Sequence, residues 1–297
     1  MAEPVRRWLV TGASGMLGSD LTAALRRAGE SVIPFGRAEL DLTRAADVRR
    51  AALRTRPDVI VNCAAWTKVD AAEQDRRTAE LVNGTAVGHL AEAADTTGAL
   101  LIQISTDFVF DGTSSRPYRP EDPPAPLSAY GASKLIGERE AARASAHLVV
   151  RASWLFGAGG PNFVEAIRKQ VDSGRTELRV VDDQHGRPTW TPHLAAAIVA
   201  LGRAALGSAD ARGIVHYGDE PPCSWFDFAV EIVAALRPAG EIVVRPVPSS
   251  EFPRPAARPP FSVLDTSRYE SITGLRPASW KEGLARYLGA SGAFGAS

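Results

Sequence analysis

A glycine-rich turn near the N-terminus constrains this chain more than any other feature of its sequence. The apolar run Arg7–Val10 leads into Thr-Gly-Ala-Ser-Gly-Met-Leu-Gly at residues 11–18, and a stretch with helical spacing follows over Leu17–Ala28. A strand, a tight glycine turn and a helix in this order let the backbone approach a pyrophosphate, and the helix N-terminus offers N–H groups to it. The spacing is GxxGxxG, and we expect a dinucleotide-binding turn rather than a plain turn, made by Gly12, Gly15 and Gly18.

Strands and helices alternate through the first half of the chain. Apolar strands are predicted over Ser31–Phe35, Asp58–Asn62, Leu100–Ser105 and His147–Arg151, and helices over Ala45–Arg54, Ala79–Thr97 and Tyr130–Ala144. Strands separated by helices of this length form βαβ units and a parallel sheet. We therefore expect an α/β fold, a doubly wound parallel sheet of the Rossmann type, with a smaller C-terminal substrate-binding region.

The second half of the chain is less regular. Six prolines in Pro246–Pro260 predict an irregular, extended loop, because proline lacks a backbone N–H. We expect a dinucleotide-binding domain over residues 1–154 with a returning segment at about 184–217, and a substrate-binding region over 155–183 and 218–297. Helices are predicted over Asn162–Asp172, Leu194–Ala205, Ser224–Leu236 and Ser279–Leu288, and strands over Leu178–Val181 and Glu241–Val247.

Charge and cysteine content exclude several classes of protein. The chain has 34 Lys+Arg and 34 Asp+Glu, so we expect no binding to nucleic acid through phosphates. No apolar run is long enough to span a bilayer, and we interpret the short N-terminal run as a strand rather than a signal peptide. The two cysteines, Cys63 and Cys223, and five scattered histidines form no disulfide framework and no metal site. We expect a cytoplasmic protein without nucleic-acid, membrane or metal partners.

A threonine, a tyrosine and a lysine form the candidate catalytic group. Thr106 follows a buried strand, and Tyr130 and Lys134 are four residues apart on a predicted helix, so they share one face. An ammonium beside the phenol is expected to lower the pKa of the phenol below its usual ~10, and it can also hold a nicotinamide ribose. A threonine hydroxyl can bond a substrate carbonyl and the alkoxide that develops from it.

The alternative is an incidental Tyr–Lys pair on a helix surface. Two observations favour the catalytic interpretation. The pair follows the strand end and the glycine turn in the right order, and Lys134 is one of four lysines among 34 basic residues.

The residues after the second strand bear on the choice of cofactor. No acidic residue ends Ser31–Phe35, whereas Arg37 follows it closely, and Glu39 and Asp41 come slightly later. An arginine at this place accommodates the 2′-phosphate of NADPH. We expect NADPH, with NADH as the alternative if Arg37 is only a solvated surface residue.

Taken together, these motifs resemble the extended short-chain dehydrogenase/reductase superfamily and, within it, the dTDP-4-dehydrorhamnose reductase family. The matching segments run in family order from about Leu9 to Leu288. They are residues 11–18, 40–42, 59–70, 105–112, 130–134, 151–156, 180–189 and 258–265.

The resemblance implies a role for each matching position. Thr106, Tyr130 and Lys134 would form the catalytic triad, and Tyr130 and Lys134 would also touch the cofactor. The cofactor would be lined by Gly15, Met16, Leu17, Asp41, Leu42, Ala64 and Ala65, and the sugar pocket by Thr67, Val69, Asp107, Phe108 and Trp154. Phe108 stands where a tyrosine is expected, so one hydroxyl is missing.

Two further positions have alternative interpretations. Arg258, in the proline-rich loop, is a candidate for the nucleotide diphosphate of a sugar substrate, because Arg suits phosphate geometry, or for a plain loop salt bridge. Some family members bind magnesium through glutamates at a dimer contact. Asp20 takes the corresponding first-helix position here without a clear second ligand. We therefore predict no metal and leave a homodimer open.

The implied activity is NAD(P)H-dependent reduction of the 4-keto group of a dTDP-4-keto-6-deoxyhexose. The expected conversion is dTDP-4-dehydrorhamnose to dTDP-L-rhamnose or a related deoxysugar. The alternative within this class is another nucleotide-sugar 4-ketoreductase, from antibiotic sugar biosynthesis. A non-catalytic regulatory subunit of the same fold is the alternative from another class, and the intact Thr106, Tyr130 and Lys134 argue against it. An epimerase or dehydratase ranks lower, because Asp107 is the only acid directly after Thr106.

Overall fold

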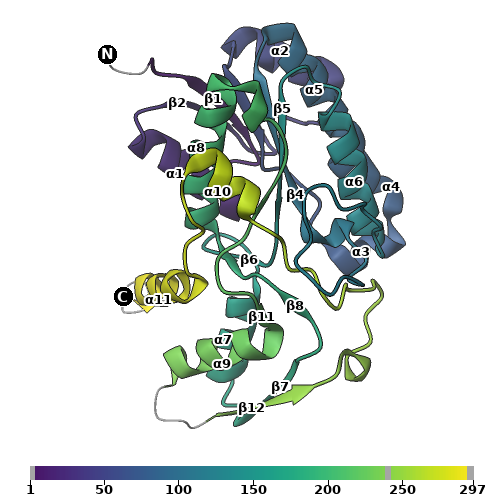
Figure 1. Cartoon of the computed structure of the whole chain (residues 1–297), viewed down its shortest axis with the longest axis vertical. Coiled ribbons are helices and arrows are strands. Elements are labelled where there is room, and N and C mark those ends of the chain that lie inside the picture. Colours follow the sequence, from purple (N-terminus) through teal and green to yellow (C-terminus); the bar gives the residue numbers. More distant parts are fainter. Residues whose placement is uncertain (1–3, 238–241, 293–297) are drawn as a thin grey trace.

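A six-stranded parallel sheet forms the centre of the molecule (Figure 1). The computed structural model describes residues 4–237 and 242–292. The strand order is β10-β5-β4-β3-β1-β2, and every neighbouring pair is parallel. The doubly wound parallel sheet expected from the sequence is confirmed. Its strands are β1 (Arg7–Thr11), β2 (Ser31–Phe35), β3 (Val59–Asn62), β4 (Leu100–Thr106), β5 (His147–Ala152) and β10 (Gly213–Tyr217).

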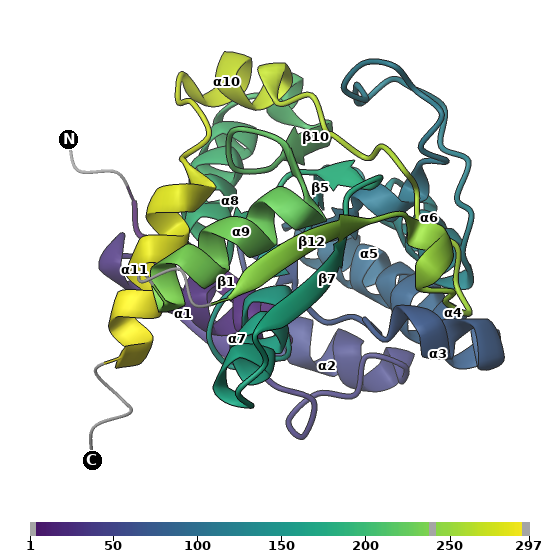
Figure 2. The ribbon, with the colours of Figure 1, turned by 90° about the horizontal axis from the view of Figure 1, so that it is seen from below.

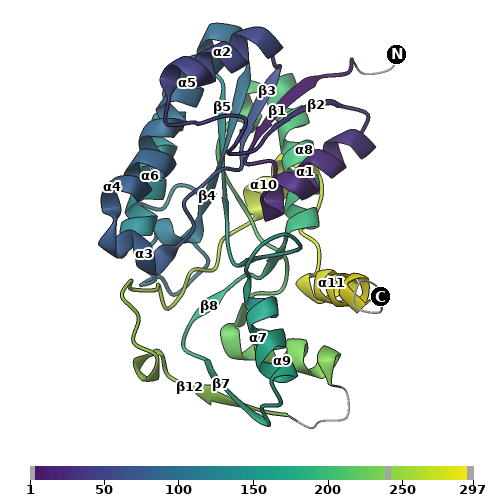
Figure 3. The same ribbon diagram turned by 180° about the vertical axis from the view of Figure 1, so that it is seen from behind.

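Alternation along each strand supplies an apolar surface on both faces of the sheet. In β1, Trp8 and Val10 enter one core and Leu9 enters the other, as the two-residue period of a strand requires. Helices α1 (Met16–Arg27), α8 (Thr191–Gly207) and α10 (Ser267–Thr273) cover the first face (Figure 3). Helices α2 (Ala45–Thr55), α5 (Ala86–Thr97) and α6 (Ala129–Ala141) cover the second.

A third core lies below the sheet and belongs to later segments of the chain (Figure 2). It contains Phe156, Ile167, Leu178, Phe228 and Trp280, all nearly fully buried. The elements around it are α7 (Phe163–Asp172), β7 (Glu177–Val181), α9 (Trp225–Leu236), β12 (Val243–Val247) and α11 (Trp280–Gly292). β12 pairs with β7 in parallel. Two further pairs of short strands lie in this part of the chain. β6 (Leu155–Phe156) pairs with β9 (Thr189–Trp190), and β8 (His185–Gly186) pairs with β11 (Cys223–Ser224).

The helix predicted over Ala79–Thr97 is interrupted. The structure has α4 (Arg76–Glu80), a π-helical turn η1 (Leu81–Thr85) and then α5. The Asn83 side chain bonds the backbone of Trp66 and the hydroxyl of Ser133. A Cβ at Gly84 would lie 2.7 Å from Ile136, so the turn also packs closely on α6. These tertiary contacts accompany the break that helical periodicity does not reveal.

Other differences from the sequence prediction are smaller. Strand β10 and helices α3 (Val69–Gln74) and α10 were not predicted, nor were the short 3₁₀ turns η2 (Asp107–Val109), η3 (Ala209–Ala211) and η4 (Ser249–Glu251). The proline-rich loop begins later than expected, because Pro246 and Val247 complete β12. Glu241, predicted to start that strand, lies outside the described residues. Across residues 4–237 and 242–292, each helix is too short or too polar to cross a membrane.

Candidate active site

The glycine turn lies at the point where the strand order of the sheet reverses, between β1 and β3. Gly12 has a φ of +63°, and a Cβ on it would lie 2.6 Å from the backbone nitrogen of Ala64. A Cβ on Gly18 would lie 2.1 Å from the carbonyl oxygen of Gly12. Only glycine fits either position without moving backbone, and Ala64 is thereby held against the turn. Helix α1 begins here with no side chain capping it, so a phosphate can take that place.

The candidate ribose site lies beside this turn, after β2. Gly36 packs near the Ser14 hydroxyl, which places the following residue, Arg37, close to the turn with an exposed side chain. The Asp41 carboxylate accepts hydrogen bonds from the hydroxyl and N–H of Thr43, which hold its pKa below the usual value. One oxygen of Asp41 is therefore engaged by Thr43, and the exposed Arg37 lies near enough to interact with this carboxylate electrostatically.

Thr106, Tyr130 and Lys134 meet at the carboxyl end of β4. Lys134 is buried, and its Nζ donates to the carbonyl oxygen of Ile104 at 2.6 Å. The Tyr130 phenol lies close to the Thr106 hydroxyl, whose contact favours the phenolate, although burial outweighs it. A Cβ at Gly131 would lie 2.2 Å from the Phe108 carbonyl oxygen, so the first turn of α6 can approach η2 only with glycine at that position.

Burial sets the ionisation of this group. It raises the pKa of Tyr130 to about 12 and lowers the pKa of Lys134 to about 8. The pKa of Tyr130 is thus raised, not lowered as expected from the sequence, because desolvation of the phenol, helped by the Asp107 charge, outweighs the contact with Thr106. At neutral pH the phenol is therefore protonated, which is the form that can donate a proton, and most of Lys134 is charged.

Asp107 ties the catalytic strand end to the C-terminal part of the chain. Its carboxylate accepts a hydrogen bond from the Thr106 hydroxyl at 3.0 Å and another from the Ser262 hydroxyl at 2.5 Å. Asp107 is buried, which raises its pKa to about 6. The sequence analysis did not single out Ser262, although the segment 258–265 that contains it was part of the family pattern.

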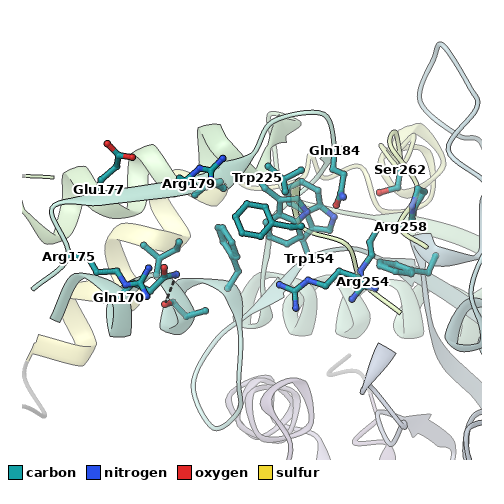
Figure 4. Close-up of a pocket in the computed structure, with 18 residues that line it drawn as sticks. Trp154, Gln170, Arg175, Glu177, Arg179, Gln184, Trp225, Arg254, Arg258 and Ser262 are labelled. Atoms are coloured by element: carbon teal, nitrogen blue, oxygen red, sulfur yellow. Dashed lines mark hydrogen bonds between the residues drawn. The ribbon is translucent and has the colours of Figure 1, made fainter. Parts of the chain in front are cut away.

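A cavity of about 850 Å³ opens next to this group (Figure 4). Ser262 and Arg258 lie at one end of it, Arg175 lies at the other, and the Trp154 and Trp225 rings lie between them. Phe108 joins the cavity to the catalytic group, since its ring meets that of Tyr130 edge to face at 5.7 Å between centroids. The lining residues that the sequence analysis missed include Phe163, Arg175, Arg179, Trp225, Phe252 and Arg254.

Trp154 is held as a rigid wall of the cavity. Its backbone has a φ of +50°, a left-handed conformation that is uncommon for a bulky residue. The indole stacks on Trp225 with ring centroids 3.5 Å apart and planes 6° from parallel. A Cβ at Gly186 would lie 2.4 Å from the same indole, so glycine is required there.

Arg258 forms the loop salt bridge that was one of the two expectations drawn from the sequence, whereas its contact with a nucleotide diphosphate stays a prediction. It lines the cavity and forms a two-pronged ion pair with Asp70, at 2.5 Å and 2.9 Å. The pair joins the proline-rich loop to α3 and holds the pKa of Asp70 below its usual value. Thr67 and Val69 do not line the cavity. Thr67 is exposed, and Val69 begins α3 beside Asp70.

The first-helix position considered for magnesium serves a different purpose. The Thr191 hydroxyl donates to the Asp20 carboxylate at 2.6 Å, which links α8 to α1. Partial burial raises the pKa of Asp20. The described ranges contain no group of three or more His, Cys, Asp or Glu side chains able to hold a metal ion.

Comparison with known proteins identifies the family. The family model for the RmlD substrate binding domain matches residues 6–292. A dTDP-4-dehydrorhamnose reductase from Streptomyces griseus is 47% identical over 285 residues, 95% of this chain and 92% of that protein. A dTDP-4-keto-6-deoxy-D-glucose reductase from Streptomyces niveus is 42% identical over 276 residues, 91% of this chain and 93% of that protein.

A crystal structure agrees with the sequence relatives. The dTDP-4-dehydrorhamnose reductase from Bacillus anthracis, solved in complex with NADP, superposes with a TM-score of 0.89 at 36% identity. The match covers 97% of this chain and 100% of that one. The chain therefore belongs to the dTDP-4-dehydrorhamnose reductase family.

Proposed function

We propose that this protein uses NADPH to reduce the 4-keto group of a dTDP-4-keto-6-deoxyhexose. The observation that carries the proposal is the meeting of Thr106, Tyr130 and Lys134 at the carboxyl edge of the sheet, between the glycine turn and the cavity. Ligands of open α/β sheets bind at this edge. The names of the relatives from Streptomyces griseus and Streptomyces niveus support the substrate class.

The residues of the turn fit a dinucleotide. A Cβ on Gly12 or Gly18 would collide with backbone that closes the turn, and the N-terminus of α1 has no side-chain cap. Gly15, Met16, Leu17, Ala64 and Ala65 would surround the pyrophosphate and nicotinamide half, and Leu42 the adenosine half. The related Bacillus anthracis enzyme was crystallised with NADP, and Arg37 would hold the 2′-phosphate here. NADH remains the weaker alternative.

Reduction needs a hydride at the carbonyl carbon and a proton at the carbonyl oxygen. When bound, NADPH supplies the hydride. Tyr130 donates the proton from its phenol as the oxygen gains negative charge, and burial keeps that proton in place until then. Lys134 would hold the nicotinamide ribose, and the Thr106 hydroxyl would orient the carbonyl. The product is the alcohol, so electrons and protons balance.

The cavity suits the rest of the substrate. The hexose would lie against Phe108 and Trp154, close to Tyr130. Arg258 and Arg254, near the Ser262 end of the cavity, would offer positive charge to a diphosphate there, although Arg258 also pairs with Asp70. Arg175 lies at the other end, and Arg179 is paired with Glu251. We also propose the domain division and the cytoplasmic location expected from the sequence. Light scattering will decide whether the protein is a homodimer.

The direct test is to follow NADPH absorbance with purified protein and dTDP-4-keto-6-deoxyhexoses of both C5 configurations. Wild type should oxidise NADPH, and product analysis will identify the preferred sugar. Tyr130→Phe should keep NADPH binding and lose about 10²–10⁴-fold in kcat. Tyr269→Phe, which removes a phenol hydroxyl on α10 that does not line the cavity, is the matched control and should keep full activity.

Other outcomes would support the alternatives. A wild-type protein that binds the sugar nucleotide without turnover would indicate the regulatory subunit. Exchange of sugar hydrogens with deuterated water and no net loss of NADPH would indicate an epimerase. Near-normal turnover by Tyr130→Phe would contradict the proposed mechanism.

A further inference from the structure

A buried charged group lies directly behind the candidate catalytic residues. Glu138 follows Lys134 by four residues on α6 and is only 5% exposed. Its carboxylate accepts hydrogen bonds from Arg151 Nε at 2.9 Å, from Arg151 Nη2 at 2.7 Å and from the Ser105 hydroxyl at 2.5 Å. Arg151 is 1% exposed. Both charges of this ion pair are thus removed from water.

The partners of Glu138 come from the two strands that carry the site. Ser105 precedes Thr106 at the end of β4, and Arg151 lies near the end of β5. A third strand, β10, extends this cluster, because the imidazole nitrogen Nε2 of His216 lies 3.3 Å from Arg151 Nη1. Burial lowers the pKa of His216 to about 3, so this imidazole is neutral. Glu138 therefore fixes the position of α6 relative to β4 and β5, next to the candidate catalytic residues.

A buried ion pair is a poor source of fold stability, because desolvation of the two charges offsets their attraction. Its position suggests another purpose. Residues 130, 134 and 138 are spaced by four, so they share one face of α6. Lys134 meets the Ile104 carbonyl from β4 and, electrostatically, Glu138 on its own helix and Cys63 after β3. Burial raises the pKa of Cys63 to about 12, so that thiol is neutral and Glu138 supplies the charge.

We propose that Glu138 is a positioning residue that anchors the catalytic helix to β4 and β5 and keeps the buried Lys134 ammonium charged. The ammonium donates to the Ile104 carbonyl and bonds no carboxylate within the part of the chain that the structure describes, so a fixed negative charge one turn away favours the protonated form. The inference rests on the proposed function, which gives Lys134 its role toward the ribose.

The test measures the ionisation of Lys134 directly. The chain has four lysines, at 68, 134, 169 and 281, so protein labelled with ¹³C at lysine Cε should give four resolvable signals. Lys134→Arg assigns the signal of interest. In Glu138→Gln, the pKa of Lys134 from the Cε titration should fall by about one unit, because an opposite charge has been removed.

Glu140 offers a matched control on the same helix. Glu140 lies two residues after Glu138 in the sequence and forms an exposed ion pair with Arg143. Glu140→Gln should leave the Lys134 titration unchanged. An unchanged Lys134 pKa in Glu138→Gln, or an equal fall in Glu140→Gln, would overturn the proposal.

Loss of Glu138 leaves the Arg151 guanidinium buried without a counter-charge, which threatens the fold. The double variant Glu138→Gln with Arg151→Met removes both charges, so it should fold. Because loss of the Arg151 cation offsets part of the loss of the Glu138 anion, the pKa of Lys134 should fall by less than in Glu138→Gln but stay below the wild-type value. If both variants fail to fold while Glu140→Gln melts like wild type, Glu138 is purely structural and the proposal is wrong.

Kinetics separate this proposal from the proposed function. If both hold, the alkaline fall of kcat/KM for NADPH should move to lower pH in Glu138→Gln by the shift seen in the Lys134 titration. A shifted titration with no ketoreductase activity in wild type would leave Glu138 in its role and refute the proposed function. An active enzyme with an unshifted titration would refute only the role of Glu138.

Discussion

The efficiency of cofactor use should fall above about pH 8, and Lys134 rather than Tyr130 should cause the fall. Burial lowers the pKa of the Lys134 ammonium to about 8 and raises the pKa of the Tyr130 phenol to about 12. As pH rises between these two values, Lys134 loses its charge while Tyr130 keeps its proton. The proposed catalytic acid should therefore be intact at a pH where the proposed ribose contact has already weakened.

The size of the effect follows from the charge that is lost. One pH unit above its pKa, about 10% of a lysine remains charged. A neutral amine can still donate a hydrogen bond to a ribose hydroxyl, but the charge-assisted part of the contact, about 1.4 kcal/mol, is gone. These two quantities together predict a fall of roughly five- to tenfold in kcat/KM for NADPH between pH 7 and pH 9.

The measurement is kcat/KM for NADPH from pH 6.5 to 9.5 at saturating sugar nucleotide, since this parameter reports the enzyme before the cofactor binds. The control is Lys134→Arg, whose guanidinium stays charged over the whole range. Its rate is expected to be lower, but the fall above pH 8 should disappear. A flat wild-type profile, or the same fall in Lys134→Arg, would refute the reasoning.

Three further predictions test the cofactor site, the cavity and the buried histidine. Arg37→Ala should raise the Kd for NADPH at least ~10-fold more than the Kd for NADH, because a charge-assisted phosphate contact is lost; equal weakening would mean that Arg37 does not touch the 2′-phosphate. Trp154→Ala should raise the KM for the sugar nucleotide by roughly 5- to 100-fold and leave the Kd for NADPH, from fluorescence titration, nearly unchanged; a selective loss of NADPH binding would place the sugar elsewhere. His216, whose pKa is about 3 in the folded protein against 6.5 ordinarily, should take up a proton on unfolding as pH falls below 6.5, so the folded state loses about 2 kcal/mol by pH 5. Thermal melts at pH 7 and pH 5 should show a smaller acid loss in His216→Gln, and an identical loss would contradict this assignment.

Local patterns in the sequence were sufficient for five strands of the parallel sheet, β1 to β5, and for the edge that carries the candidate catalytic group. The strand–turn–helix order around Gly12 and Gly18 predicts the crevice, because the backbone there tolerates no Cβ. The four-residue spacing of Tyr130 and Lys134 places both on one face of α6, and parallel strands bring the ends of β1, β3 and β4 to one edge. Each of these inferences depends on contacts between residues that are close in sequence, or on the fixed period of a helix or strand.

Only the tertiary structure decided the features made by contacts between distant segments. Ser262 reaches Asp107 across 155 residues, and Arg258 reaches Asp70 across 188. The Trp154–Trp225 stack and the pairing of β10 with β5 are likewise non-local. No periodicity along the chain encodes which loops meet, because that depends on how the third core packs below the sheet.

The ionisation of the site shows the same division. Spacing alone suggests that Lys134 lowers the pKa of Tyr130, yet the structure shows the opposite shift. The sequence determines which titratable groups are neighbours on a helix, since four residues make about one turn. Burial is set by every segment that packs over those groups, and here removing the phenolate from water is the largest cause of the shift, so the tertiary structure decides its direction.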